Sequence, residues 1–205
     1  MTYIELKNEL NSFSVFSLKD IKAIDPNFHR SRLNDWQKKG YLQKIIRGYY
    51  VFSDTQITDK ILFKIANKIY SPSYVSLETA LSYYGFIPEA VYAITSVSTK
   101  KTTSFNTFAA NFMYRSIAKH IFFGYDLIAD NNRCFRMAKP EKAILDFLYL
   151  HPDLEKADDF SSLRINIEIF LKKVKKDIFF NYMDAFKQKK LKKRAMKFWE
   201  YINHA

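Results

Sequence analysis

Hydrophobic and polar positions change their spacing several times along the chain, and the first clear pattern predicts a short helix after Ser17. Leu18, Ile21 and Ile24 recur every three residues, which places them on one face of a helix. The Ser17 hydroxyl can accept a hydrogen bond from a backbone N–H of the first turn, as N-cap residues do. We expect this helix to end before Pro26, because the residue preceding a proline is pushed out of the helical region.

A second helix is predicted from Pro26 to about Lys39. Proline suits the first helical position, and Asp25 precedes it as a cap. Leu33 and Trp36 are three residues apart and would both face the first helix. Gly40 can adopt the left-handed conformation that commonly ends a helix.

A β-hairpin is predicted to follow, with strands at Tyr41–Lys44 and Tyr49–Phe52 and a turn near Arg47 and Gly48. Two short helices followed by a basic hairpin is the order of elements in a winged helix-turn-helix. That fold places one helix in the DNA major groove and the hairpin on the flanking backbone. A small helical domain with solvated charges would show the same helices, and the added hairpin favours the DNA-binding interpretation.

Polar and basic side chains gather on the early part of the second helix and on the hairpin. In the major groove Arg pairs with guanine and Asn with adenine, whereas cations on a hairpin would meet phosphates. The candidate DNA-binding residues are Asn27, His29, Arg30, Arg32, Asn34, Lys38, Lys44 and Arg47.

The other three quarters of the chain alternate between helical and strand periodicity. Helices are predicted over Thr58–Tyr70, Tyr74–Tyr84, Pro140–Leu150, Arg164–Lys176, Phe179–Phe186 and Lys187–Asn203. Strands are predicted over Val91–Ser98, Asn111–Ile117, His120–Leu127 and Cys134–Met137, with a polar turn over Lys100–Thr107 and an acidic loop over Pro152–Ser162. We therefore predict an α+β chain with a winged helix-turn-helix domain at residues 1–54. A second domain at residues 55–205 would have a mixed α/β middle and a basic helical C-terminal region.

The formal net charge of +12 over 205 residues is concentrated at the C-terminal end, where residues 163–205 contain twelve Lys and Arg against four Asp and Glu. A basic chain favours polyanionic partners, which it binds less tightly as salt rises. The most basic stretch is either the solvated face of an amphipathic helix or a contact with nucleic acid or a protein partner. Its candidate contact residues are Lys189, Lys190, Lys192, Lys193, Arg194 and Lys197.

Cysteine content and hydropathy bound the environment of the chain. The single cysteine, Cys134, excludes an internal disulfide framework, and we expect it to be a small buried apolar residue. The chain shows neither a charged-then-apolar leader nor a run of 18 apolar residues. We therefore expect a cytoplasmic protein that makes no membrane contact.

Catalytic and metal-binding patterns are missing from the sequence, so we expect no enzyme activity, no metal and no cofactor. The histidines lack the spacing of a zinc site, and four glycines leave no glycine-rich phosphate loop. The Asp158–Asp159 pair lies in a polar stretch typical of solvated surface. Glu141 and Asp146 accompany a helix that starts at Pro140, which is a structural role.

Three stretches of the chain resemble the abortive-infection antitoxins of the AbiEi type, which are bacterial regulators linked to phage defence. The first contains KKGYL and RGYYVF within Lys38–Phe52. The others are YVSLETALSYYGFIP at Tyr74–Pro88 and FRMAKPEKAILDFLYL at Phe135–Leu150, which are the more specific as a pair. The basic C-terminal region matches this family less well.

The resemblance implies a transcription factor that represses its own two-gene operon and counteracts a nucleotidyltransferase-like toxin. In that family the N-terminal winged helix binds repeated operator sites, and the C-terminal part is associated with antitoxin activity. Two alternatives stay open. In place of DNA binding, the chain would bind the toxin, or the RNA on which the toxin acts, through its basic C-terminal helices. Repeated operator sites suit either a dimer or two monomers.

Overall fold

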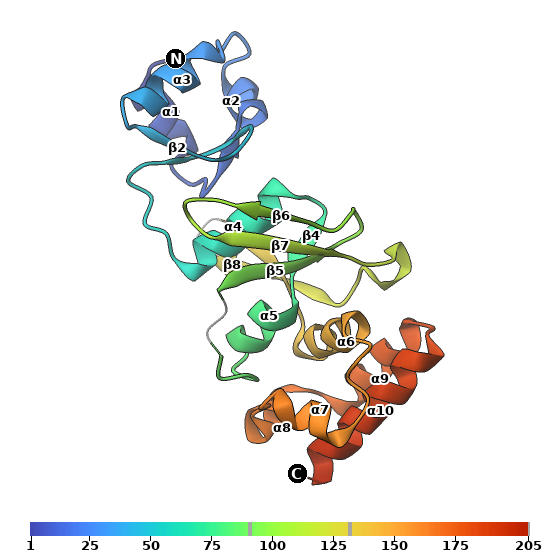
Figure 1. Ribbon diagram of the computed structural model, residues 1–205. Coiled ribbons are helices and arrows are strands. Elements are labelled where there is room, and N and C mark those ends of the chain that lie inside the picture. The colour runs from blue at the N-terminus through green and yellow to red at the C-terminus, as the bar shows by residue number, and fades with distance from the viewer. Residues whose placement is uncertain (90–91, 131–132, 205) are drawn as a thin grey trace.

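The computed structural model describes residues 1–89, 92–130 and 133–204, and it has an α+β fold (Figure 1). Its helices are α1 (Tyr3–Leu10), α2 (Leu18–Ile24), α3 (Ser31–Lys38), α4 (Asp59–Ile69), α5 (Leu77–Tyr83), α6 (Pro140–Leu150), α7 (Ala157–Ser162), α8 (Ile167–Lys173), α9 (Lys176–Ala185) and α10 (Lys189–His204), with a 3₁₀ turn at Lys119–Ile121. Its strands are β1 (Phe16–Ser17), β2 (Leu42–Ile46), β3 (Tyr49–Phe52), β4 (Ser73–Val75), β5 (Ala93–Ser98), β6 (Thr103–Asn106), β7 (Asn111–Ser116), β8 (Tyr125–Asp130) and β9 (Arg133–Ala138).

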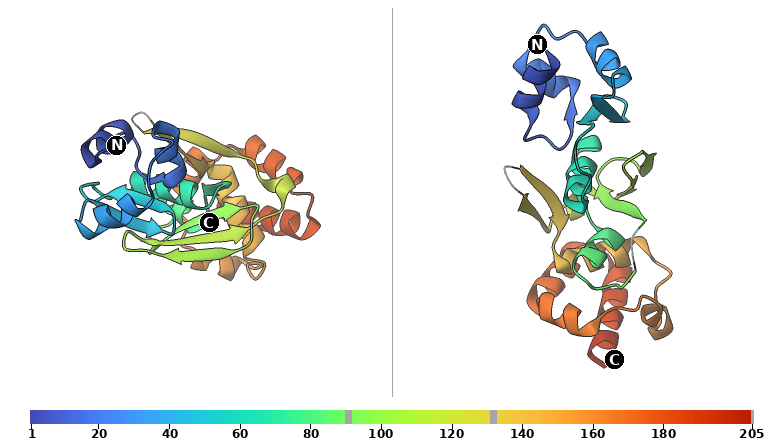
Figure 2. Two further views of the ribbon diagram at one scale, coloured as in Figure 1. Left: turned by 90° about the horizontal axis from the view of Figure 1, so that it is seen from above. Right: turned by 90° about the vertical axis from the view of Figure 1, so that its left-hand side faces the viewer.

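These elements lie in three tiers along the long axis of the molecule (Figures 1 and 2). The first tier holds α1, α2, α3 and a small sheet of order β1-β3-β2. The second is a six-stranded mixed sheet of order β6-β7-β5-β4-β9-β8 together with α4. The third comprises the helices from α5 and α6 to the C-terminal α10. Residues 53–58, which join β3 to α4, contain the boundary predicted at residue 54.

The first tier begins each of its first two helices with a reciprocal cap. Ser17 caps α2 as expected: its hydroxyl accepts from the backbone N–H of Asp20, whose carboxylate accepts from the Ser17 N–H at 2.7 Å. Thr2 and Glu5 form the same arrangement at α1. The sequence patterns above predict no helix or strand at residues 3–10, so α1 is an addition. Ile24 of α2 is 38% exposed, so the expected apolar face continues only as far as Ile21.

The second helix starts later than predicted, at Ser31 instead of Pro26. The Asp25 side chain accepts a hydrogen bond from the Asn27 N–H at 3.1 Å, and its backbone carbonyl accepts from Phe28 at 3.0 Å. These bonds close a turn, which competes with helix formation because Asp satisfies the backbone locally. The end of the helix is as predicted, with Gly40 at a φ of +73°.

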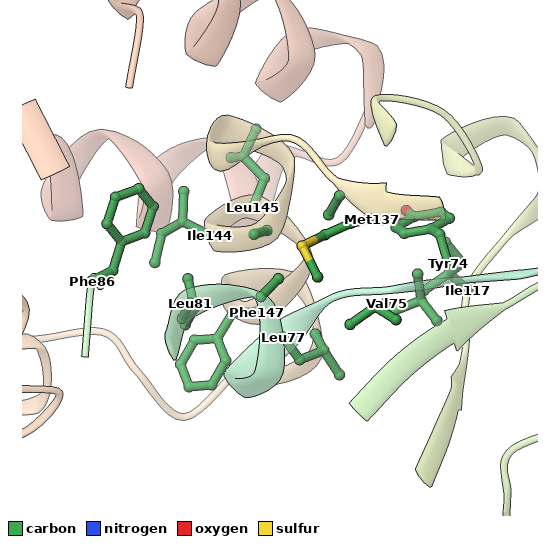
Figure 3. Close-up of a cluster of buried hydrophobic side chains, with 14 of the residues drawn as sticks. Tyr74, Val75, Leu77, Leu81, Phe86, Ile117, Met137, Ile144, Leu145 and Phe147 are labelled. Atoms are coloured by element: carbon green, nitrogen blue, oxygen red, sulfur yellow. The ribbon is translucent and has the colours of Figure 1, made fainter. Parts of the chain in front are cut away.

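In the second tier, α4 packs against the mixed sheet. Tyr114 of β7 donates its hydroxyl hydrogen bond to the carbonyl of Ala66 at 2.7 Å, and Phe63 lies 5.4 Å from the ring of Phe135. The main core continues into α5 and α6. Figure 3 shows Leu77 and Leu81 of α5 gathered with Ile144, Phe147 and Met137 into one buried cluster.

The structure corrects the prediction of a helix over Tyr74–Tyr84, because its first residues belong to β4. Ser73–Val75 pair with β5 in antiparallel fashion, and Val75 pairs in parallel with Met137 of β9. All three residues are buried. A fully buried strand has no alternation to distinguish it from the start of a helix, and so the sequence pattern missed it.

Two further predictions fail in the middle of the chain. The predicted polar turn over Lys100–Thr107 contains β6, an edge strand whose alternate residues face solvent, so its polar composition hid it. The predicted strand over His120–Leu127 is divided by Gly124, which has a φ of +71°; β8 begins only after it. Strand β7 matches its prediction to within one residue. Strand β5 matches from Ala93 to Ser98, whereas Tyr92 lies before it and Val91 is outside the described residues.

The C-terminal helices also differ in detail. The predicted loop over Pro152–Ser162 contains α7, whose start is capped by Asp159 as it accepts from the N–H groups of Glu155 and Lys156. The predicted helix over Arg164–Lys176 is shorter, since α8 ends at Lys173 and Val174 is extended and buried. Helices α6, α9 and α10 correspond to predicted ones. Within the described residues, no helix combines the length and apolar character that crossing a bilayer requires.

Candidate nucleic-acid interface

Leu33 and Trp36 hold helix α3 against the rest of the first tier, as the three-residue spacing between them predicts. Both side chains are buried, and the Trp36 ring lies 5.5 Å from Phe28 and 5.9 Å from Tyr3. Phe28 thus anchors the turn before α3 in the same core. This packing leaves the opposite side of α3 facing solvent.

The side chains that were proposed from the sequence as base contacts occupy the turn before α3 and α3 itself. Asn27 and His29 are exposed in the turn instead of on the helix, and Arg30 is the exposed residue that precedes the first helical position. Asn34 and Lys38 are exposed on α3. Arg32 is half-buried, with its guanidinium 5.6 Å from the centre of the Trp36 ring, so part of its surface is already covered.

The hairpin formed by β2 and β3 has apolar side chains on both faces, which the sequence analysis overlooked. Leu42, Tyr50 and Phe52 pack into the core of the first tier. Ile45 and Val51 belong to the larger core of the second and third tiers. The hairpin therefore lies between the two cores. The sequence contains a signal for this. A strand with one buried face needs apolar residues only at alternate positions, and Ile45, Ile46 and Val51 supply more than that.

Two basic residues of the hairpin stay exposed despite this packing. The register between β2 and β3 shifts between Lys44 and Ile46, which buries Ile45 while Gln43 and Lys44 both face solvent. Arg47 is exposed at the turn, beside Gly48. The hairpin can thus offer Lys44 and Arg47 to a phosphate backbone, but its faces are not free.

The charge around α3 is mixed, with the basic residues in excess. Asp35 is exposed on α3. The Asp25 carboxylate forms an ion pair with the N-terminal amine, which lies 3.4 Å away. Helix α2 adds two exposed cations that were not proposed, Lys19 and Lys22. They add to the exposed basic side chains of the first tier, which include Arg30, Lys38, Lys44 and Arg47.

An ion pair joins helix α2 of the first tier to helix α4 of the second tier. Lys68 of α4 lies 2.9 Å from the Asp20 carboxylate of α2. Partial burial works to raise the pKa of Asp20, but hydrogen bonds from Ser17 and Lys68 outweigh it and hold that pKa below its ordinary value. The same carboxylate therefore caps α2 and ties it to α4.

The candidate contacts on α10 are only partly available. Leu191, Ala195, Phe198 and Ile202 form the buried stripe, and Lys189, Lys190 and Lys193 are exposed opposite it. Lys192 is also exposed, but it pairs with Asp184 at 2.7 Å. Lys197 is exposed and donates to the carbonyl of Glu155 at 3.2 Å.

The prediction that Arg194 is a contact residue is wrong, because its guanidinium is buried. It donates to the carbonyls of Leu148 and Pro152, each at 2.9 Å, and so fastens α10 to the end of α6. A cation with these bonds is a structural residue. It cannot reach a nucleic acid or a protein partner in this structure.

A buried polar cluster lies where α6 meets β4. Asp146 accepts hydrogen bonds from Tyr74 and Ser76, each at 2.9 Å, and pairs with Lys142, whose ammonium also contacts the Tyr74 hydroxyl. Burial raises the pKa of the Asp146 carboxyl, against the opposing influence of Lys142. The Asp146 and Lys142 side chains are fully buried, so this cluster offers no open surface to a substrate.

Two other residues that the sequence singles out, Cys134 and Glu141, lie outside this cluster. Cys134 is exposed, contrary to the expectation that it would be buried. The Glu141 carboxylate accepts from the Lys175 N–H at 2.8 Å and so contributes to the start of α9. Among the described residues, no group of three or more His, Cys, Asp or Glu side chains is placed to hold a metal ion.

Comparison with models of known protein families finds no match for this chain, and comparison with curated proteins finds no relative.

Proposed function

We propose that this chain binds duplex DNA sequence-specifically and that its N-terminal residues 1–54 act as a winged helix-turn-helix. One observation carries the proposal: α3 buries Leu33 and Trp36 while its turn and outer face expose Asn27, His29, Arg30, Asn34 and Lys38. A recognition helix needs this division between a packed face and a polar face. Lys44 and Arg47 on the hairpin then contact the phosphates.

The wider role that we propose is that of an autorepressor and antitoxin of a bacterial abortive-infection system. It rests on the resemblance of Lys38–Phe52, Tyr74–Pro88 and Phe135–Leu150 to the AbiEi-type family. The partners are then operator DNA at the chain's own promoter and a nucleotidyltransferase-like toxin in the cytoplasm. The proposed role needs no catalytic residue and no cofactor.

The direct test is a binding titration against DNA from upstream of the chain's own gene, with random DNA of equal length as the control, at two salt concentrations. Sequence readout predicts tighter binding to the upstream DNA that persists at the higher salt. Equal binding to both DNAs, lost together as salt rises, would mean that only the net charge is measured. That outcome would refute the proposal.

Two substitutions divide the proposed surface into base and phosphate contacts. Arg30→Ala should cost about 1–3 kcal/mol on the preferred site only, as the loss of a base contact does. Arg47→Ala should weaken binding to all DNAs and reduce the salt slope by about 1. Arg115→Ala, on β7 of the second tier, is the control for the loss of one arginine. If Arg30→Ala and Arg47→Ala both behave like this control, the recognition surface is wrongly assigned.

A second candidate function is the binding of the toxin or its RNA substrate through α10. The exposed row of Lys189, Lys190 and Lys193 opposite a buried apolar stripe favours it. Reversing these three charges should abolish rescue from the toxin and leave operator binding intact. Rescue that survives the reversal would remove this candidate.

A further inference from the structure

A hollow of about 280 Å³ opens where the first tier meets the second. Its walls come from the segment after α1, from α4, and from β8 and β9. The ribbon views show α4 next to the first tier, with β8 and β9 beside it (Figures 1 and 2). The volume is close to the lower end of the range for ligand pockets, which is about 300–1,000 Å³.

The lining of this hollow is strongly basic. It includes Lys64 and Lys68 of α4 and Arg133 and Arg136 of β9, and no Asp or Glu among the described residues lines it. Cations gathered around one hollow attract an anion, because protein on one side screens them less than bulk water does.

The two lysines already have acidic partners, whereas the two arginines have none among the described residues. Lys64 pairs with Asp130 at 2.5 Å, and Lys68 pairs with Asp20. Within the described part of the chain, the half-buried guanidinium of Arg136 makes neither an ion pair nor a hydrogen bond. The Arg133 guanidinium lies 3.6 Å from the centre of the Phe13 ring and has one long contact, at 3.4 Å, with the Ser12 hydroxyl.

The backbone that carries Arg136 is held firmly. The Asn67 side chain of α4 accepts from the Arg136 N–H and donates to the Arg136 carbonyl at 3.3 Å. It takes the place of a neighbouring strand, since β4 pairs with β9 only at Met137. The fixed backbone removes one part of the cost of ordering, and the planar guanidinium matches the oxygens of a phosphate.

The hollow also has an apolar wall, formed by Phe13, Val15 and Leu127. A second hollow of about 360 Å³ adjoins it, sharing Phe13, Lys64 and Arg133. The second hollow is lined by Asp54 and Asp130 as well as by cations, and these two acids pair with Lys7 and Lys64. Its excess of positive charge is therefore smaller, and a phosphate group is favoured in the first hollow. The pair of hollows therefore suits a molecule with one phosphate end and an uncharged body.

We propose that this junction is a binding site for a small organic phosphate, such as a nucleoside monophosphate, held by Arg133 and Arg136. The two guanidinium groups bind the phosphate oxygens, and the apolar wall covers the uncharged body. This site is separate from the exposed surface of α3, and the proposal does not depend on DNA binding.

The test is calorimetric titration of the full chain with three probes: AMP, pyrophosphate and adenosine. We expect AMP to bind and adenosine not to bind. If pyrophosphate binds as tightly as AMP, the site recognises phosphate alone. If pyrophosphate binds more weakly than AMP, the site also recognises the organic body. The absence of AMP and pyrophosphate binding at millimolar concentration, or adenosine binding as tightly as AMP, would overturn the proposal.

Variants locate the binding. Arg136→Gln should weaken AMP binding at least tenfold, whereas Arg115→Gln, a half-buried arginine on β7 of the same sheet, should leave it unchanged. Leu127→Glu offers a second variant that should not disturb folding, because Leu127 is 63% exposed, and its carboxylate should also repel the phosphate. Equal affinity in the wild type, Arg136→Gln and Leu127→Glu would place the bound anion elsewhere and refute the site.

Discussion

Single residues in this chain show how burial decides what a charge does. Lys142 and Asp146 are both ionisable residues of the helix that is predicted to start at Pro140. The structure encloses them completely, together with Tyr74 and Ser76. Each charge is satisfied by the other and by hydroxyl groups, so the removal of one partner leaves the other buried without compensation.

We predict that Asp146→Ala destabilises the chain by about 3–5 kcal/mol, because it leaves the Lys142 ammonium buried without its counter-charge. Urea unfolding followed by circular dichroism measures the change. The double variant Lys142→Met/Asp146→Leu, which removes both charges and keeps the volume, should lose less than Asp146→Ala. A cost below about 1 kcal/mol for Asp146→Ala would show that water or local opening satisfies Lys142.

At the scale of elements, the hairpin formed by β2 and β3 is the part whose surroundings matter most. A wing that projects into solvent would be apolar on one face only, but Ile45 and Val51 pack into the core of the second and third tiers. The hairpin therefore also connects the first tier to the rest of the chain.

Ile45→Ala is accordingly expected to cost about 2–5 kcal/mol of unfolding free energy, as the truncation of a buried isoleucine does. Ile24→Ala is the matched control, because Ile24 is 38% exposed on α2, and we expect a change within about 0.5 kcal/mol. Chemical denaturation of both variants makes the comparison. Equal effects would mean that the outer face of the hairpin is not packed in solution.

At the scale of the whole molecule, the contact between the first two tiers combines apolar packing with an ion pair between Asp20 and Lys68 of α4. The same Asp20 carboxylate also caps α2. Its lowered pKa means that the folded state favours the carboxylate. The resulting stabilisation is present above the ordinary pKa of 3.8 and is lost as pH falls through the lower pKa of the folded state.

We therefore predict that Asp20→Asn lowers the unfolding free energy at neutral pH, and that its difference from the wild type shrinks as pH falls below the ordinary aspartate pKa. Unfolding curves at a series of pH values measure this. Asp153→Asn, an exposed aspartate in the segment before α7, is the control and should show no such trend. A difference that stays constant over the whole pH range would contradict the assignment of this carboxylate.

Much of the local structure was predictable, and the reasons are local. The Ser17 cap, the Gly40 helix end, the Arg47–Gly48 turn and the α6 helix each depend on residues within about one turn of one another. The exposed candidates on and before α3 followed from the positions of Leu33 and Trp36. Helix α1 went unassigned although its Thr2–Glu5 capping box is a local signal.

Other features were decided only by tertiary structure, because they depend on groups distant in the sequence. Arg194 is removed from the candidate contacts on α10 by the carbonyls of Leu148 and Pro152, which lie more than forty residues earlier. Tyr74 is in a strand because β5 and β9 flank it, and Ile45 is buried because another tier covers it. The sequence by itself determined the α+β content and the polar face of α3. Tertiary structure decided which charges remain free, because burial and pairing are properties of the assembled chain.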